Sequence, residues 1–168
     1  IANFFLPRGK VIVTTKGKTK QASNTYKTLR EPLDLDIPIT VLVNGATASA
    51  SEILSGAFQD FDRAVIVGSR TFGKGLVQTT RPLPYGGVMK LTTSKYYIPS
   101  GRCVQAIDYK HRNEDGSVGT IPDSLTTVFH TAAGREVRDG GGVMPDIEVK
   151  QEKLPNILFY LVRDNLIF

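Results

Sequence analysis

Residues 37–67 constrain the fold more than any other part of this chain, because two apolar runs flank one amphipathic segment. Ile37–Val43 and Ala64–Val67 are near-continuous apolar runs, which is typical of strands that are buried on both faces of a sheet. Between them, apolar residues recur with the period of a helix over Ala50–Phe61. This order predicts a βαβ unit with two parallel strands and a right-handed crossover.

The polar residues of the predicted helix are expected to face solvent. Because its apolar positions share one face, the opposite face is left for the polar side chains. These side chains are Ser51, Glu52, Ser55, Gln59 and Asp60.

The rest of the chain is predicted to be mostly β-structure in a single α/β domain of 168 residues. Leu76–Leu83 and Val88–Ile98 are rich in strand-forming residues and are separated by turn residues, which predicts an antiparallel hairpin that Cys103–Tyr109 extends. Other expected elements are the end of a helix at Ile1–Leu6, strands at Val11–Thr15, Asn24–Thr28, Gly134–Asp139 and Asp146–Lys150, a segment at Leu125–His130 that fits either a strand or a helix, and an amphipathic helix at Pro155–Arg163.

The composition is ordinary for a globular protein, with 40% hydrophobic and 22% charged residues. No apolar run approaches the ~20 residues that span a bilayer, so no membrane span is expected. The net charge of +5 permits an acidic partner. The densest basic run, Lys16–Lys20, lacks clustering and interleaved aromatic residues, so it is interpreted as a solvated loop and nucleic-acid binding is not expected. A single cysteine, Cys103, excludes an internal disulfide.

Ser49 lies where the first strand of the βαβ unit turns into the helix. This edge of an open α/β sheet is where ligands bind. The first N–H groups of a helix lack intrahelical partners, and together with the positive end of the helix dipole they stabilise an oxyanion. Ser49 is therefore a candidate nucleophile, with the Ala50 N–H beside it as a candidate oxyanion donor.

A serine nucleophile needs a base, and Lys74 is the candidate. It lies between Gly73 and Gly75, and no carboxylate occurs between residues 69 and 80 to keep it charged. Burial lowers the pKa of a lysine by up to several units, which allows a lysine to act as a base. If the chain is extended after Lys74, Gln78 lies on the same side of the strand and its amide can orient the amine.

Other interpretations of these residues stay open at this point. Ser49-Ala50-Ser51-Glu52 also fits the S-x-x-E pattern of a capping box, in which the Ser49 hydroxyl only accepts a hydrogen bond from the helix. Lys74 fits a surface lysine in a glycine turn equally well. The two histidines, His111 and His130, are tied to no carboxylate by the sequence, and structural or surface roles are expected for them.

The segments around Ser49 and Lys74 resemble the signatures of one protease family. Asn44–Ala57 resembles the nucleophile segment of the C-terminal processing peptidases, also called tail-specific proteases, and Val67–Gln78 resembles their lysine segment. The serine and the lysine are 25 positions apart here, as they are in that family. Two further stretches are similar to family signatures, namely Tyr96–Arg102 and Gly141–Ile147.

The resemblance implies a serine endopeptidase that cuts proteins near unstructured C-terminal tails. Ser49 would be the nucleophile, and Lys74 would be the general base and then the acid for the leaving amine. Gln78 would orient Lys74, and the Ala50 N–H would be one oxyanion donor. Ser51 is the rival nucleophile, but it does not align with the serine of the family.

The same resemblance implies a fold and a setting. The fold would be α/β, with a core of the crotonase and Clp-protease type built from parallel strands and helices, and with an antiparallel β extension. No cofactor and no metal would be needed. The protein would act outside the cytoplasm, in the periplasm or cell envelope of a bacterium.

Residues 1–168 differ from members of the family because two parts that those members carry do not occur in them. Family members carry a PDZ domain that captures the C-terminus of the substrate, and an Asn-Pro-Gly-Gly loop upstream of the counterpart of Ile1 that supplies a second oxyanion donor. Neither occurs in these 168 residues. The chain is therefore expected to be a partial peptidase domain that is weakly active or inactive by itself. Strand edges that lack their neighbours would favour self-association.

Two other functions stay open from the sequence. A non-catalytic module would hold a peptide tail against an exposed strand edge by β-augmentation, without cutting it. An acyl-CoA enzyme on a similar core would need an adenine and pyrophosphate site, which the sequence does not show.

Overall fold

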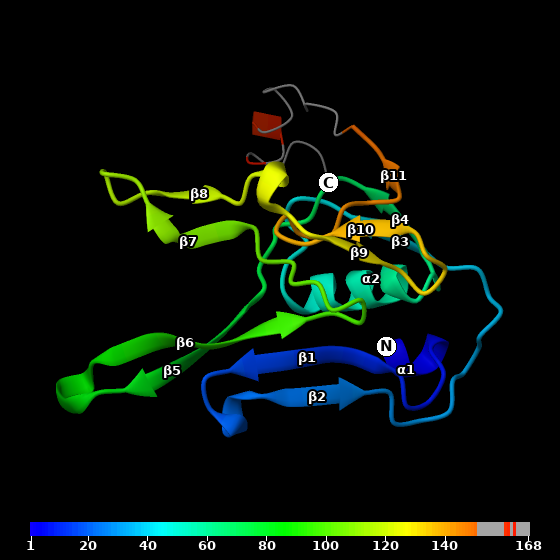
Figure 1. Cartoon of the computed structure of the whole chain (residues 1–168), viewed down its shortest axis with the longest axis horizontal. Coiled ribbons are helices and arrows are strands. Elements are labelled where there is room, and N and C mark those ends of the chain that lie inside the picture. The colour runs from blue at the N-terminus through cyan, green and yellow to red at the C-terminus, as the bar shows by residue number, and fades with distance from the viewer. Residues whose placement is uncertain (151–159, 162, 164–168) are drawn as a thin grey trace.

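The computed structural model describes residues 1–150, 160, 161 and 163. Its central element is α2, Ala50–Asp60, which contacts β4 of a parallel sheet and β1 of an antiparallel sheet (Figure 1). None of the helices in this described part is long and apolar enough to cross a membrane. The arrangement is a mixed α/β fold in which one helix connects the two sheets.

The parallel sheet has the strand order β11-β4-β3. Its strands are β3, Thr40–Val43, β4, Val65–Gly68, and β11, Ile147–Glu148. Both pairs are parallel, and α2 is the connection between β3 and β4. The predicted βαβ unit and its parallel strand pair are therefore confirmed.

The two apolar runs of this unit are not buried on both faces, so this part of the prediction was wrong. Val43 and Ile66 are buried, whereas Leu42 is 78% exposed and Val65 is 44% exposed. Successive side chains of a strand point to opposite faces of a sheet. The described residues cover the face that contains Val43 and Ile66 and leave the face with Leu42 and Val65 open.

The antiparallel sheet has the strand order β2-β1-β6-β5. The strands are β1, Val11–Gly17, β2, Asn24–Lys27, β5, Leu76–Pro82, and β6, Val88–Tyr97. β5 and β6 form the predicted antiparallel hairpin, and its far half extends beyond the other elements (Figure 1). In the part of the chain that the structure describes, β5 is an edge strand of this sheet.

The segment after β6 does not extend this hairpin, contrary to the prediction for Cys103–Tyr109. β7, Ile107–Arg112, pairs instead with β8, Val118–Thr120. The chain turns away at Arg102, which is buried in an ion pair with Asp60 of α2. That ion pair joins the segment to the helix, so it cannot continue alongside β5 and β6.

The remaining elements are short. Leu125–His130, which fitted either a strand or a helix, contains β9, and the strands predicted at Gly134–Asp139 and Asp146–Lys150 correspond to β10 and β11. The predicted helix at Pro155–Arg163 lies outside the described residues, apart from positions 160, 161 and 163. The elements whose bounds have not yet been given are α1, Ala2–Phe5, β9, Val128–His130, and β10, Glu136–Arg138. Short 3₁₀ turns lie at Lys20–Ala22, Pro84–Gly86 and Asp123–Leu125.

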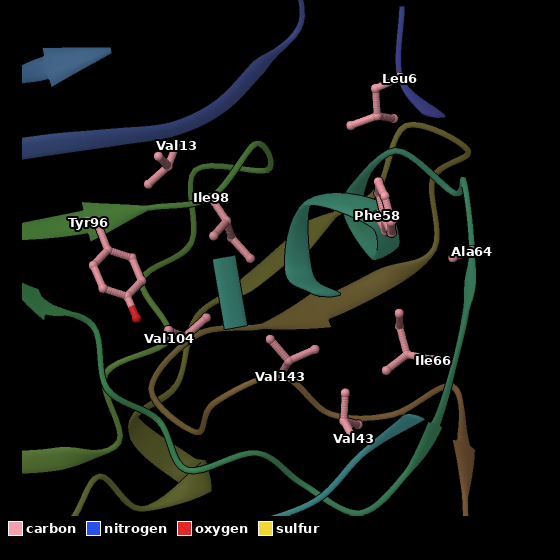
Figure 2. Packing of buried hydrophobic residues seen from close by; sticks show 10 residues of the cluster. All are labelled: Leu6, Val13, Val43, Phe58, Ala64, Ile66, Tyr96, Ile98, Val104 and Val143. Atoms are coloured by element: carbon pink, nitrogen blue, oxygen red, sulfur yellow. The ribbon is translucent and has the colours of Figure 1, made fainter. Parts of the chain in front are cut away.

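One hydrophobic cluster joins α2 to both sheets (Figure 2). Its members come from the end of α1, where Leu6 is the C-cap, from both sheets, α2, the turn before β4 and the loops after β6 and β10, and they are Leu6, Val13, Val43, Phe58, Ala64, Ile66, Tyr96, Ile98, Val104 and Val143. Full burial of a large apolar side chain contributes about 1.5–3 kcal/mol to folding. The cluster therefore packs α2 against both sheets.

Candidate active site

α2 begins at Ser49, whose backbone has φ 56° and ψ −114°. A residue with a Cβ occupies this region only at a cost of ~1–3 kcal/mol, and such strained residues concentrate at functional sites. Two hydrogen bonds stabilise this strained backbone conformation. The Ser49 N–H donates to the Glu52 carboxylate at 2.8 Å, and the Ser49 carbonyl accepts from the Ile53 N–H at 3.0 Å.

The capping box that the sequence allowed is present at this turn. The contact that meets hydrogen-bond geometry joins the Ser49 N–H to Glu52, whereas the reciprocal contact from the Glu52 N–H to the Ser49 hydroxyl is looser than a hydrogen bond. The backbone N–H of Ser49 therefore makes the stronger of the two contacts of the box.

Glu52 connects this turn to the Lys74 segment. Its side chain is fully buried, which corrects the prediction that it faces solvent. One carboxylate oxygen accepts from the Thr71 hydroxyl at 2.5 Å and from the Gly73 N–H at 2.6 Å. The other accepts from the N–H groups of Ser49 and Lys74, each at 2.8 Å. The backbones of the two candidate catalytic residues therefore share one acceptor atom.

Tyr96 of β6 joins the same two residues through their carbonyl groups. Its hydroxyl donates to the Lys74 carbonyl oxygen and lies 3.4 Å from that of Ser49. Burial, and then the nearby charge of Glu52, raises the pKa of Tyr96 above its ordinary value. The hydroxyl therefore keeps its proton and remains a donor. We call this arrangement of Glu52 and Tyr96 the Glu52–Tyr96 clamp.

The backbone around Lys74 is fixed by close packing as well. Gly73 has a φ of 83°, and a Cβ added there would lie 2.3 Å from the Cβ of Ala106. The Gly75 N–H donates to the Gln105 side chain at 2.8 Å. A side chain at Gly73 would clash, so the two glycines flanking Lys74 allow this close approach.

The structure brings the segments of Ser49 and Lys74 together, and both residues are half-buried. Among the described residues, no hydrogen bond joins the Ser49 hydroxyl, the Lys74 amine and the Gln78 amide. Gln78 is exposed on β5, and Ala50 is the exposed first residue of α2. Their predicted roles in chemistry stay predictions.

The residues that were set aside from the sequence lie at the surface. Ser51 is exposed, and its carbonyl accepts from the Ser55 hydroxyl at 2.8 Å. His130 is exposed on β9. His111 is exposed on β7, as expected, but its ring contacts the Asp108 carboxylate at 2.6 Å, so it is paired with a carboxylate after all.

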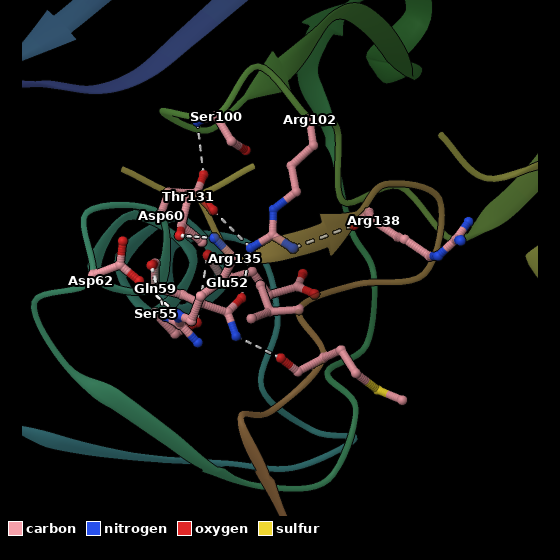
Figure 3. Close-up of polar contacts among 12 residues, drawn as sticks. Glu52, Ser55, Gln59, Asp60, Asp62, Ser100, Arg102, Thr131, Arg135 and Arg138 are labelled. Atoms are coloured by element: carbon pink, nitrogen blue, oxygen red, sulfur yellow. Dashed lines mark hydrogen bonds and ion pairs between the residues drawn. The ribbon is translucent and has the colours of Figure 1, made fainter. Parts of the chain in front are cut away.

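Four of the polar side chains of α2 are buried, which corrects the prediction that they face solvent: Glu52, Ser55, Gln59 and Asp60 (Figure 3). Ser51 is exposed, as predicted. Asp60 forms an ion pair with Arg102 at 2.9 Å and accepts from the Ser100 N–H at 2.9 Å. Gln59 accepts from Arg102 at 2.7 Å and donates to the Met144 carbonyl at 2.8 Å. Burial raises the pKa of Asp60, and the charge of Arg102 opposes this effect.

Sequence reasoning missed Glu52, Gln59 and Asp60 because helical period alone does not show which segments cover a polar face. A signal was present in the sequence, since Arg102 lies in one of the two later signature stretches. A cation in such a stretch could have been paired with the carboxylates of the helix. Among the described residues, no group of three or more His, Cys, Asp or Glu side chains is arranged to hold a metal ion.

A second polar group links the end of α2 to β10 and the segment before β11, and it predicts a pH dependence of stability. Arg135 contacts the carboxylates of Asp62 and Asp146 at 2.6 Å each. Burial opposes the ionisation of Asp62, but the Ala133 N–H and Arg135 hold its pKa below the ordinary value. The folded protein therefore binds fewer protons here than the unfolded chain, and this stabilisation is lost as the pH falls below about 4.

We expect Asp62→Asn to lower the free energy of unfolding by up to about 1 kcal/mol at neutral pH, since the pair with Arg135 is partly exposed to solvent. The difference from the unmodified protein should shrink as the pH falls below about 4. Urea unfolding across this pH range measures it. Glu114→Gln, in the exposed loop between β7 and β8, controls for the loss of one negative charge. An Asp62→Asn difference that stays constant with pH would contradict the expectation.

Comparisons with known proteins found a matching family, related sequences and similar solved structures. A model of peptidase family S41 matches residues 1–124. The carboxy-terminal-processing protease of Bartonella bacilliformis is 45% identical over 107 residues, which cover 64% of this chain and 24% of that protein. A probable CtpA-like serine protease of Staphylococcus aureus is 43% identical over 106 residues, covering 62% of this chain and 21% of that protein.

Solved structures give the same result. The photosystem II D1 C-terminal processing protease superposes with a TM-score of 0.61 at 29% identity, over 96% of this chain and 33% of that one. A putative S41 protease from Bacteroides fragilis has a TM-score of 0.57 at 13% identity, over 99% of this chain and 40% of that one, and supports the fold alone. The chain thus spans about a quarter of the length of the curated relatives and a third of the first of these structures.

Proposed function

The chain belongs to peptidase family S41, and on that premise we propose that it is the catalytic core of a serine endopeptidase that cuts proteins near unstructured C-terminal tails. The observation that supports this most directly is the Glu52–Tyr96 clamp. It holds the backbones of Ser49 and Lys74 together from both their N–H and their carbonyl sides.

In the proposed reaction, the Ser49 hydroxyl attacks the scissile carbonyl carbon while the Lys74 amine accepts its proton. The negative oxygen of the tetrahedral intermediate lies at the start of α2, where the Ala50 N–H and the positive end of the helix dipole stabilise it. Lys74 then gives the proton to the leaving amine, and the acyl group on Ser49 is hydrolysed by water. Gln78 orients Lys74.

Further parts of this proposal rest on the family relationship. The core is of the crotonase and Clp-protease type, and the protein acts outside the cytoplasm, in the cell envelope of a bacterium. Residues 1–168 contain no Asn-Pro-Gly-Gly sequence, so the second oxyanion donor of the family is not encoded within them. We therefore propose that these 168 residues alone cleave more slowly than the longest natural form of the protein, by ~100- to 1,000-fold if one donor is lost.

Labelling with a fluorophosphonate, which forms a bond to an activated serine, tests the assignment. We expect the label on Ser49 in the longest natural form of the protein, together with cleavage of a disordered C-terminal tail. Ser51→Ala is the matched control, because Ser51 is the exposed serine two residues after Ser49, and this variant should label normally. Cleavage with the label on Ser51 would overturn the choice of nucleophile. Tail binding without labelling or cleavage would favour the non-catalytic module.

A further inference from the structure

The far half of the β5–β6 hairpin is a two-stranded arm that extends beyond the other elements (Figure 1). Among the described strands, β1 pairs with β6 only over Ser94–Tyr97, and β5 is an edge strand. Residues 81–92 are all exposed. A two-stranded hairpin by itself is at best marginally stable in water, so packing against another surface stabilises it. The arm is therefore a candidate interaction surface.

The arm ends in a group of exposed apolar side chains. They are Leu83, Tyr85, Val88, Met89 and Leu91. Single exposed apolar residues are normal on a protein surface, whereas a contiguous group marks a site that binds a protein or a membrane. The tip of the arm therefore has the composition of a docking surface.

Tyr85 lies in the turn that closes the arm, and its side chain is fully exposed. Its backbone has φ 61° and ψ 28°, in the left-handed region that a bulky residue rarely adopts. Strained residues of this kind concentrate at functional sites. Tyrosine is enriched where a membrane meets water, because its ring is apolar and its hydroxyl is polar. The turn thus presents a residue type that suits a membrane interface.

The apolar side chains lie on both faces of the arm. Directly paired residues of an antiparallel ladder point to the same face, and successive residues point to opposite faces. Met89 pairs with Arg81 on one face, and Val88 pairs with Pro82 on the other. A protein that packs on one face would leave the other exposed, whereas lipid surrounds an inserted tip on every side. The two-sided distribution therefore favours a bilayer over a protein.

The charge of the arm has one sign. Arg81 lies on one face and Lys90 on the other, and both side chains are exposed. No aspartate or glutamate occurs between Asp62 and Asp108. Lysine and arginine lay their stems along apolar surface and extend their charges into water, and each cation near an anionic bilayer strengthens binding about fivefold. The arm is therefore complementary to an anionic lipid surface.

We propose that the tip of the β5–β6 arm inserts into the interface of an anionic bilayer. Tyr85 and Val88 enter the apolar boundary, and Arg81 and Lys90 contact the headgroups. Because β5 begins two residues after Lys74, the inserted arm keeps the candidate active site near the membrane surface. The inference does not depend on the proposed endopeptidase function, since the tip residues are outside the candidate active site.

Co-sedimentation with vesicles measures the interaction. The longest natural form of the protein is mixed with vesicles of phosphatidylcholine, either alone or with an equal part of phosphatidylglycerol. We expect stronger binding to the mixed vesicles, and weaker binding at high salt, because salt screens exposed charges. Arg81→Gln combined with Lys90→Gln should weaken this binding about 25-fold, since two cations are lost. Lys18→Gln combined with Lys20→Gln, in the densest basic run, is the matched control and should bind like the unmodified protein.

A second pair of variants tests insertion of the tip without changing its charge. Tyr85→Ser combined with Val88→Ser removes apolar surface and should weaken binding to the mixed vesicles by about tenfold or more. Leu29→Ser combined with Leu33→Ser, at two exposed leucines of the loop after β2, is the matched control and should not weaken it. All four side chains are exposed, so the thermal unfolding of both variants should match that of the unmodified protein.

Four results would overturn the proposal. Equal losses in the control variants would show that the arm is not the site of contact. A loss in the charge variant without a loss in the serine variant of the arm would show adsorption without insertion. Binding to pure phosphatidylcholine that matches the mixed vesicles would exclude recognition of anionic lipid. Absence of binding to both vesicles would exclude a membrane, and an oligomeric state that changes in the serine variant of the arm would then identify a protein as the partner.

Discussion

Lys74→Ala is expected to lose peptide cleavage by about 10⁴-fold or more in kcat/KM, because a Ser–base pair acts as a unit and loses most of its function with either member. The fold should survive the change. Both contacts of the Glu52–Tyr96 clamp with Lys74 use its backbone N–H and carbonyl, which alanine retains. Ser49→Ala should behave in the same way for the same reason.

The measurement is the cleavage rate of an unstructured C-terminal tail by the longest natural form of the protein, together with its thermal unfolding. Lys90→Ala, on the exposed part of β6, is the matched control and should keep both activity and stability. A Lys74→Ala variant that keeps more than about a tenth of the activity would contradict the assignment of the base, because general base catalysis by a positioned group contributes at least ~100-fold.

Glu52→Gln is expected to damage stability and activity together. The buried carboxylate accepts four hydrogen bonds, and an amide can supply only one acceptor oxygen. Its NH₂ group would then face backbone N–H donors, whichever way the side chain is turned. A buried donor left without a partner costs about 1–3 kcal/mol, and more where a charged acceptor is lost.

A loss of about 2–3 kcal/mol corresponds to a fall in Tm of roughly 5–10 °C for a domain of this size. Activity should fall further than the folded fraction does, because Ser49 at φ 56° loses the acceptor that holds its N–H. Differential scanning calorimetry and cleavage assays below the Tm measure the two effects. Glu31→Gln, an exposed residue of the loop after β2, is the control. Unchanged Tm and kcat/KM in Glu52→Gln would show that the clamp does not position the site.

The pattern of the two variants distinguishes chemistry from architecture. Lys74→Ala should lose rate and keep stability, whereas Glu52→Gln should lose both. Lys74 can be replaced without disturbing the clamp because its structural role is carried by its backbone. Glu52 cannot, because its role is carried by its side chain.

The sequence by itself was enough to place Ser49 at the start of the helix and Lys74 in a glycine-flanked turn after the next strand. These features depend on local periodicity and turn residues, so they are readable over short windows. The parallel pair of β3 and β4 and the antiparallel pair of β5 and β6 followed from the same signals.

Only the tertiary structure decided which face of α2 is buried, and with it the clamp. Gln59 meets Arg102, 43 positions away, and Glu52 meets Gly73, 21 positions away. An amphipathic pattern separates polar from apolar positions, but it does not show whether solvent or a distant segment covers the polar side. Local sequence determined the elements and the candidate residues, and long-range contacts determined their geometry.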